Sequence, residues 1–165
     1  MTDDINGSIS VERDSVVVDG ANHALRGTGD LGSIGISIVE RENATVKRLE
    51  IRGFCYGIYL NGSSSCSIVE SSIIGNYWVG LRLFNSSNNA IVGNNVTNND
   101  YGIFLSVSSS NTLQSNRMSG NSYNFFVDGL LLQHFMNKID VSNTVNGRPT
   151  YYGINETDKG ILTDA

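Results

Sequence analysis

A repeat of about 22 residues runs through most of the chain and restricts its possible folds more than any other feature of the sequence. Four segments share one pattern, and their second residues are spaced by 23, 22 and 22 positions. The segments are YGIYL (56–60), VGLRL (79–83), YGIFL (101–105) and YNFFV (123–127). Two further sets of apolar residues, each spaced by one repeat and here called columns, keep the same period. The first is Val46, Ile68, Ile91 and Leu113, and the second is Ile51, Ile73, Val96 and Met118. Self-similarity at such a period indicates a stacked repeat architecture.

Each repeat contains three short apolar stretches separated by Asn, Ser and Gly. In the first stretch Ile58 and Leu60 alternate with Tyr59, and alternation in short runs predicts β-strands. An all-helical solenoid needs a period of about 33 residues or more, and the Leu/Asn signature of a leucine-rich repeat is absent. The sequence therefore predicts an all-β parallel β-helix with three sheets as its walls and coils about 4.8 Å apart.

We expect residues 1–165 to form one domain of about six coils of 22–23 residues, with an axis of about 29 Å. The regular coils are predicted at about 30–128, between an imperfect coil at 8–29 and an irregular coil and cap at 129–165. Phe135 follows Leu113 by 22 residues, and Ile139 follows Met118 by about one repeat, which predicts a further coil there. The leucines at 130–132 replace serines of a turn and are expected to fold over the open end.

Asn and Gly gather at the expected corners, because both accept left-handed backbone conformations. Stacked asparagines are expected to form amide ladders along the axis. The pairs in register are Asn89 with Asn111, Asn94 with Asn116, and Asn99 with Asn121. Arg48 and Glu70 also lie 22 residues apart, which predicts a cross-strand ion pair between them.

The charge and hydropathy patterns exclude several classes of partner. The net charge is −5 and Lys and Arg do not cluster, which argues against binding to nucleic acid or anionic membranes. No apolar run approaches the roughly 18–20 residues of a membrane span, and no charged-then-apolar leader opens the chain.

Cys55 and Cys66 lie half a coil apart, which permits a disulfide but does not require one. Six Asn-x-Ser/Thr sequons, compatible with glycosylation and export, begin at Asn6, Asn43, Asn61, Asn85, Asn95 and Asn155.

The repeats, the opening VVVDGANHALRGTG (16–29) and the tail IDVSNTVNGRPTYY (139–152) resemble the NosD-like family of right-handed parallel β-helices. That family is grouped with carbohydrate-binding and sugar-hydrolase domains of the pectin-lyase-like fold. The resemblance covers about residues 8–155, and it implies a right-handed coil, an exported or cell-surface protein and a polysaccharide partner. The copper-related role of the family would need His, Met or Cys ligands. The two His, three Met and two Cys of this chain are scattered, so we expect no metal site and no cofactor.

Catalytic residues on neighbouring coils should share a column, because residues 22 or 23 apart are lateral neighbours. Glycoside hydrolysis needs two carboxylates about 5–9 Å apart, and no column contains two acids. The paired Asp, Gly-His-Gly and Arg-x-Lys pattern of polygalacturonase-like enzymes is also absent. We interpret His23 and His134 as hydrogen-bonded turn residues rather than bases. The sequence thus predicts no catalytic residue, and a polysaccharide lyase or glycoside hydrolase of pectin-lyase-like fold stays as an alternative.

One column of outward-facing residues is the candidate binding surface. The column begins at Ser37. Its next four members, here named the aromatic stripe, are Tyr59, Arg82, Phe104 and Phe126. On adjacent coils these side chains are expected to form a flat exposed surface on which sugar rings stack. The alternatives are lateral stabilisation of the sheet, a protein contact, or cover by the C-terminal tail. A second column is expected inside the helix or at a corner: Tyr56, Val79, Tyr101 and Tyr123.

The two ends of a parallel β-helix present unpaired backbone groups. This predicts either end-to-end association into a homo-oligomer or continuation of the helix in a longer protein. Taken together, the residues and the resemblance predict a non-catalytic extracellular or cell-surface recognition module with carbohydrate as the favoured ligand. A structural or assembly repeat is the third alternative, after the enzyme.

Overall fold

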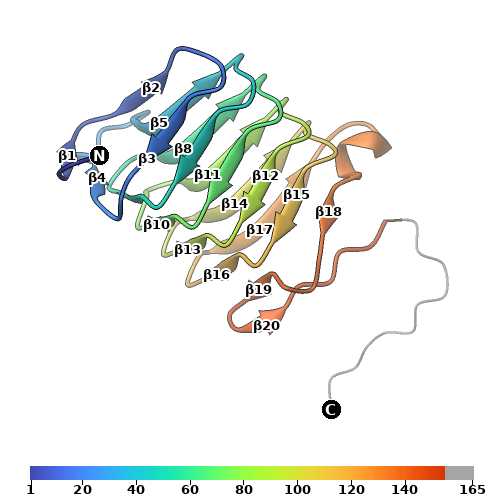
Figure 1. The fold of residues 1–165 in the computed structure, drawn as a ribbon. Coiled ribbons are helices and arrows are strands. Elements are labelled where there is room, and N and C mark those ends of the chain that lie inside the picture. The colour runs from blue at the N-terminus through green and yellow to red at the C-terminus, as the bar shows by residue number, and fades with distance from the viewer. Residues whose placement is uncertain (155–165) are drawn as a thin grey trace.

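The computed structural model describes residues 1–154 and shows a parallel β-helix (Figure 1). The chain winds around one axis, and its coils stack from the N-terminal end to the C-terminal end. Apart from one 3₁₀ turn, η1 (Leu132–Phe135), the described residues form strands, turns and irregular segments. The predicted all-β architecture of about six coils is confirmed.

Each coil supplies one strand to each of three sheets. Sheet A contains β1 (Ile5–Asn6), β4 (Ala24–Arg26), β7 (Glu50–Arg52), β10 (Ser72–Ile74), β13 (Asn95–Thr97), β16 (Arg117–Ser119), β19 (Thr144–Val145) and β20 (Arg148–Pro149). Sheet B contains β2 (Ile9–Val11), β5 (Ile34–Val39), β8 (Tyr56–Asn61), β11 (Val79–Phe84), β14 (Tyr101–Ser106) and β17 (Tyr123–Asp128). Sheet C contains β3 (Val17–Asp19), β6 (Thr45–Lys47), β9 (Ser67–Val69), β12 (Ala90–Val92), β15 (Thr112–Gln114) and β18 (Lys138–Ile139). Neighbouring strands pair in parallel except β19 and β20, which are antiparallel.

The apolar columns predicted from the repeat form the core. Ile68 pairs with Ile91 and then Leu113 in sheet C, while Ile73 pairs with Val96 in sheet A. All members of the two columns named above are 0–1 % exposed. In the three-residue strands from β6 to β16 only the middle side chain is buried, so each of these strands contributes one core residue. Complete burial of such a side chain contributes about 1.5–3 kcal/mol.

The asparagine ladders are present at the predicted pairs and extend further. In every rung the side-chain Nδ2 donates to the Oδ1 of the asparagine on the next coil, over 2.9–3.1 Å. The same Oδ1 also accepts the backbone N–H of the donor residue. The three ladders are Asn76–Asn99–Asn121, Asn89–Asn111–Asn137 and Asn94–Asn116–Asn143. They satisfy buried backbone groups at the corners, where the sheet ladder is interrupted.

The last coil exists, but its predicted register is wrong. Leu113 pairs with Ile139 rather than with Phe135, and Met118 pairs with Val145. The step from one coil to the next is 26 or 27 residues here, because the chain leaves the wall after β17 and forms η1 before β18 begins.

The end of the helix is covered by the tail instead of the leucines at 130–132. Those three side chains are 93 %, 56 % and 55 % exposed, so the expectation that they fold over the end is wrong. Tyr152 packs against the core, with its hydroxyl donating to the Phe135 carbonyl and its ring edge-on to Phe125 at 6.1 Å. The sequon at Asn155 and the rest of the predicted cap, 155–165, lie outside the described residues.

Both cysteines are buried free thiols, so Cys55 and Cys66 form no disulfide. Burial raises the pKa of the Cys66 thiol. Within residues 1–154 no helix has the length and apolar character needed to cross a membrane.

Candidate functional site: the aromatic face of sheet B

The aromatic stripe lies in register on the outer surface of sheet B. Ser37 pairs with Tyr59, Tyr59 with Arg82, Arg82 with Phe104, and Phe104 with Phe126. Phe126 is 40 % exposed, and the other three members of the stripe are half-buried. The rings of Phe104 and Phe126 meet edge to face, with centroids 5.1 Å apart.

The second tyrosine column joins this surface. Of its members only Val79 is buried, whereas Tyr123 is 53 % exposed and the other two tyrosines are half-buried. Tyr101 stacks on Tyr123 with centroids 4.8 Å apart, and on Phe104 at 5.3 Å. The tyrosines are therefore not inside the helix; each is the first residue of its strand, next to a corner, and its ring lies on the outer surface.

A glycine at the second position of the strand explains why these rings face outward. In β8 both Gly57 and Ile58 are buried, so the alternation of inward and outward residues is interrupted once. Tyr56 and Tyr59 consequently both lie on the outer surface, with their ring centroids 5.5 Å apart. A Cβ on Gly57 would lie 2.5 Å from the carbonyl oxygen of Gly80, which leaves no room for a side chain. The signal available in the sequence was the aromatic residue on each side of a Gly-apolar pair.

Arg82 lies at the centre of the rings. Its Cζ is 5.0 Å from the ring centroid of Phe104 and 5.8–5.9 Å from those of Tyr56, Trp78 and Phe84. A guanidinium within about 6 Å of a ring centroid is attracted by the negative face of the ring. Burial raises the pKa of the Tyr56 hydroxyl, so this side chain stays neutral at physiological pH.

We call this whole surface the aromatic face. It contains eight rings and one guanidinium: Tyr56, Tyr59, Trp78, Arg82, Phe84, Tyr101, Phe104, Tyr123 and Phe126. The sequence analysis missed Trp78 and Phe84, which stand just before and at the end of β11. The docked part of the C-terminal tail contacts Phe125 and Phe135 through Tyr152, at the end of the helix.

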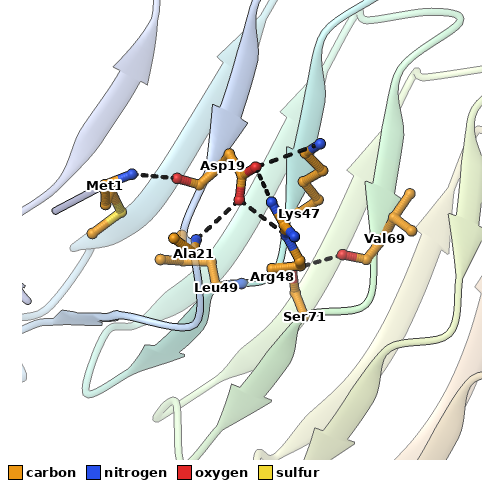
Figure 2. Close-up of polar contacts among 8 residues, drawn as sticks. All are labelled: Met1, Asp19, Ala21, Lys47, Arg48, Leu49, Val69 and Ser71. Atoms are coloured by element: carbon orange, nitrogen blue, oxygen red, sulfur yellow. Dashed lines mark hydrogen bonds and ion pairs between the residues drawn. The ribbon is translucent and has the colours of Figure 1, made fainter. Parts of the chain in front are cut away.

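A group of charged side chains lies at the corner between sheets C and A (Figure 2). The Arg48 guanidinium donates to both carboxylate oxygens of Asp19, and the Lys47 ammonium lies 3.4 Å from the same carboxylate. The bonds from Arg48 and from the Ala21 N–H hold the pKa of Asp19 well below its usual range. Exposed ion pairs of this kind contribute little to stability.

The predicted ion pair between Arg48 and Glu70 is wrong, although the register behind it is right. The Arg48 N–H donates to the Val69 carbonyl, as expected for adjacent coils. Its side chain turns to the preceding coil instead, where Asp19 is already oriented by the Ala21 N–H.

The same corner has a hollow of about 220 Å³, here called the corner hollow. It is lined by Asn22, Arg48, Leu49, Glu50, Glu70 and Ser72. Glu50 also forms an ion pair with Arg52 at 3.2 Å. Reading the sequence column by column missed this grouping of Glu50 and Glu70, because the corner brings together residues from different columns.

The histidines and sulfur residues do not form a copper site. His23 and His134 lie at opposite ends of the stack, and His134 Nδ1 accepts the N–H groups of Leu130 and Leu131. Met118 and the two cysteines are buried in separate places in the wall and core. In residues 1–154 no three His, Cys, Asp or Glu side chains are grouped so as to hold a metal ion. The residues present therefore do not fit copper.

Comparison with known proteins identifies the family. The model of the family described as periplasmic copper-binding protein (NosD) matches residues 5–160. No curated protein sequence matches the chain significantly.

Solved structures share the fold over part of their length. The enzymatically active domain of tailspike protein 2 from bacteriophage CBA120 has a TM-score of 0.54 at 21 % identity, over 87 % of this chain and 22 % of its own. The alginate lyase from Paenibacillus sp. str. FPU-7 has a TM-score of 0.54 at 18 % identity, over 85 % of this chain and 54 % of its own. The chain thus spans between about a fifth and about half of these proteins. Since the family model matches nearly the whole chain, the protein belongs to the NosD family.

Proposed function

We propose that the protein is a non-catalytic recognition module, located outside the cytoplasm, that binds a polysaccharide on the aromatic face. The observation that carries the proposal is the gathering of eight rings and one guanidinium on one wall of the helix. A pyranose ring presents a face of C–H groups, and such a face is attracted by the negative face of an aromatic ring.

The spacing of the coils supports a polymeric ligand. Tyr59, Phe104 and Phe126 stand on different coils, and adjacent coils are about 4.8 Å apart. An extended polysaccharide presents one sugar ring after another at a similar spacing, so successive sugars meet successive coils. Because each contact adds little by itself, we expect affinity to rise with the length of the glycan.

The family and the structural neighbours agree with this proposal. The family description places its proteins in the periplasm, which favours a location outside the cytoplasm for this chain. A phage tailspike domain and an alginate lyase have the same fold. Copper binding has no comparable support, since the described histidines, methionines and cysteines do not converge.

The test is a glycan array followed by titration of the polysaccharides that bind. Phe104→Ala and Phe126→Ala, alone and with Tyr59→Ala, should weaken binding at least tenfold in the triple variant. Tyr151→Ala is the matched control, because this tyrosine is 67 % exposed and lies outside the aromatic face. If the triple variant folds, as judged by circular dichroism, and binds like the wild type, the aromatic face is not the binding site.

A second candidate is a polysaccharide lyase or glycoside hydrolase, and the corner hollow is the observation that favours it. Glu50, Glu70 and Arg48 line this hollow together, and two carboxylates beside a cation are suited to acid–base chemistry on a glycosidic bond. The assay is release of reducing ends or unsaturated products from acidic and neutral polysaccharides. Turnover that is abolished by Glu70→Gln, with binding unchanged, would establish the enzyme.

A third candidate, an assembly unit, is favoured by the N-terminal end of the helix. A hollow of about 270 Å³ there is lined by Ile9, Ser10 and Val11 of β2, by Glu12 and Arg13 after it, and by Val16 and Val18 before and in β3. The strands at this end pair on one side only, so their other edge is free to receive a strand. Light scattering at tens of micromolar distinguishes this case, because an end-to-end oligomer grows with concentration and a monomer does not.

A further inference from the structure

Arg82 is a half-buried cation that lacks an anionic partner within residues 1–154. It stands on the second of the four coils of the aromatic stripe, and none of the described ion pairs includes it. Its Nε is buried and has no hydrogen-bond partner. The faces of the rings attract the positive charge, but a ring face is not an anionic acceptor for the N–H groups of the guanidinium fork.

Three other arginines do have an acidic partner. Arg26 pairs with Asp4 at 2.9 Å, Arg48 pairs with Asp19, and Arg52 pairs with Glu50. Their carboxylates come from the neighbouring coil or from the same strand. Acids thus stand beside these three arginines, and none of the described ion pairs places one beside Arg82.

The surroundings of Arg82 are otherwise almost free of charge. In the six strands of sheet B the only charged residues are Arg82 and Asp128. Asp128 lies on β17, two coils away, where it pairs with Ser106. The centre of the aromatic face is thus locally positive, although the whole chain has a net charge of −5.

We propose that Arg82 is the receptor for the acidic group of an anionic glycan, either a carboxylate or a sulfate, while the adjacent rings stack on its sugars. This inference rests on the proposed function of the aromatic face. A guanidinium donates two parallel N–H bonds to a carboxylate or sulfate, and such charge-assisted bonds are about twice as strong as neutral ones. Phe104, 5.0 Å from the guanidinium, is then placed to contact the sugar that bears the acid.

The experiment compares matched polymers by isothermal titration calorimetry. Polygalacturonate carries carboxylates, its fully methyl-esterified form is the neutral counterpart, and dextran sulfate compared with dextran provides the sulfate arm. The wild type should bind at least one acidic polymer at least tenfold more tightly than its neutral counterpart, and added salt should reduce the difference. The acidic polymer that binds more tightly identifies the acidic group.

Arg82→Gln should remove this preference, so that the variant binds the acidic polymer no more tightly than it binds the neutral one. Arg82→Lys should retain only part of the preference, since an ammonium lacks the fork. Arg117→Gln is the control, because Arg117 is exposed on sheet A and its removal changes the net charge equally.

The two proposals fail in different ways. An unchanged preference in a folded Arg82→Gln protein, or equal wild-type affinity for acidic and neutral polymers, overturns the role of Arg82. If the triple ring variant still loses binding in that case, the proposed function stands. If the wild type binds none of the polymers, acidic or neutral, both proposals fall.

Discussion

Removing the side chain of Asn94 should destabilise the helix far more than the same substitution one residue later. Asn94 is 1 % exposed, and its Oδ1 accepts the N–H of Ser71 at 3.0 Å. Its Nδ2 donates to the Ile68 carbonyl at 2.8 Å and to Asn116 Oδ1 at 3.0 Å. In Asn94→Ala the buried N–H of Ser71 loses its acceptor, and two further bonds are lost.

The expected magnitude follows from these three bonds. A buried donor left without a partner costs about 2 kcal/mol, and each of the other two bonds contributes about 1 kcal/mol, so the loss is about 4 kcal/mol. That is a large part of the roughly 5–15 kcal/mol that stabilises a typical domain. Asn95 is the matched control, because it lies half-exposed on the outer surface of β13. Asn95→Ala should change the free energy of unfolding by about 0.5 kcal/mol or less.

The assay is urea unfolding followed by circular dichroism and by the fluorescence of Trp78, the only tryptophan. The free energies of unfolding of the two variants should differ by about 3–4 kcal/mol, with similar slopes against urea. A difference below about 1 kcal/mol would refute the reasoning, because it would mean that the buried amide bonds contribute no more than bonds to water.

Three further predictions concern the wall and its corners. Gly57→Ala places a Cβ 2.5 Å from the Gly80 carbonyl oxygen, so it should destabilise the protein by about 1–3 kcal/mol, and an unchanged urea midpoint would contradict this. The bonds from Arg48 and the Ala21 N–H lower the folded pKa of Asp19, so its contribution to stability is complete above the unfolded pKa of about 4 and is lost as pH falls below it. The difference in urea midpoint between wild type and Asp19→Asn should therefore be largest near pH 7 and shrink toward pH 2, and a constant difference would count against the pairing. Cys66 is 1 % exposed and its pKa is raised by burial, so its thiol should react with Ellman's reagent only on unfolding; rapid labelling of the native protein would show otherwise.

The period of the sequence was sufficient to predict the core of the regular coils, because each three-residue strand from β6 to β16 has a single buried position. Val46, Ile68 and Ile91 align as predicted for this reason. The prediction failed where the period changes, as at the last coil, where Leu113 meets Ile139. Extra residues in a surface excursion cost little free energy, so nothing in the core pattern reveals them.

The candidate site was only partly predictable, for two physical reasons. The stripe from Tyr59 to Phe126 follows directly from the register, whereas the outward direction of Tyr56 was not predicted, because Gly57 interrupts the alternation on which the prediction depended. A side chain at a corner can also pair with a residue on either of the two adjacent coils. Arg48 has an acid within reach on each adjacent coil, and only the orientation of Asp19 by a backbone N–H decides between them.

The asparagine ladders give the helix a direction. Every rung points its Nδ2 toward the C-terminal neighbour, so three parallel files of amide dipoles run along the axis in the same sense. Hydrogen bonds in such a file polarise one another, so an amide with neighbours on both sides is held more strongly than one with a neighbour on a single side. Loss of order should therefore begin outside the files and at their end amides. The files start at Asn76, Asn89 and Asn94, so the coils before these residues lack this support.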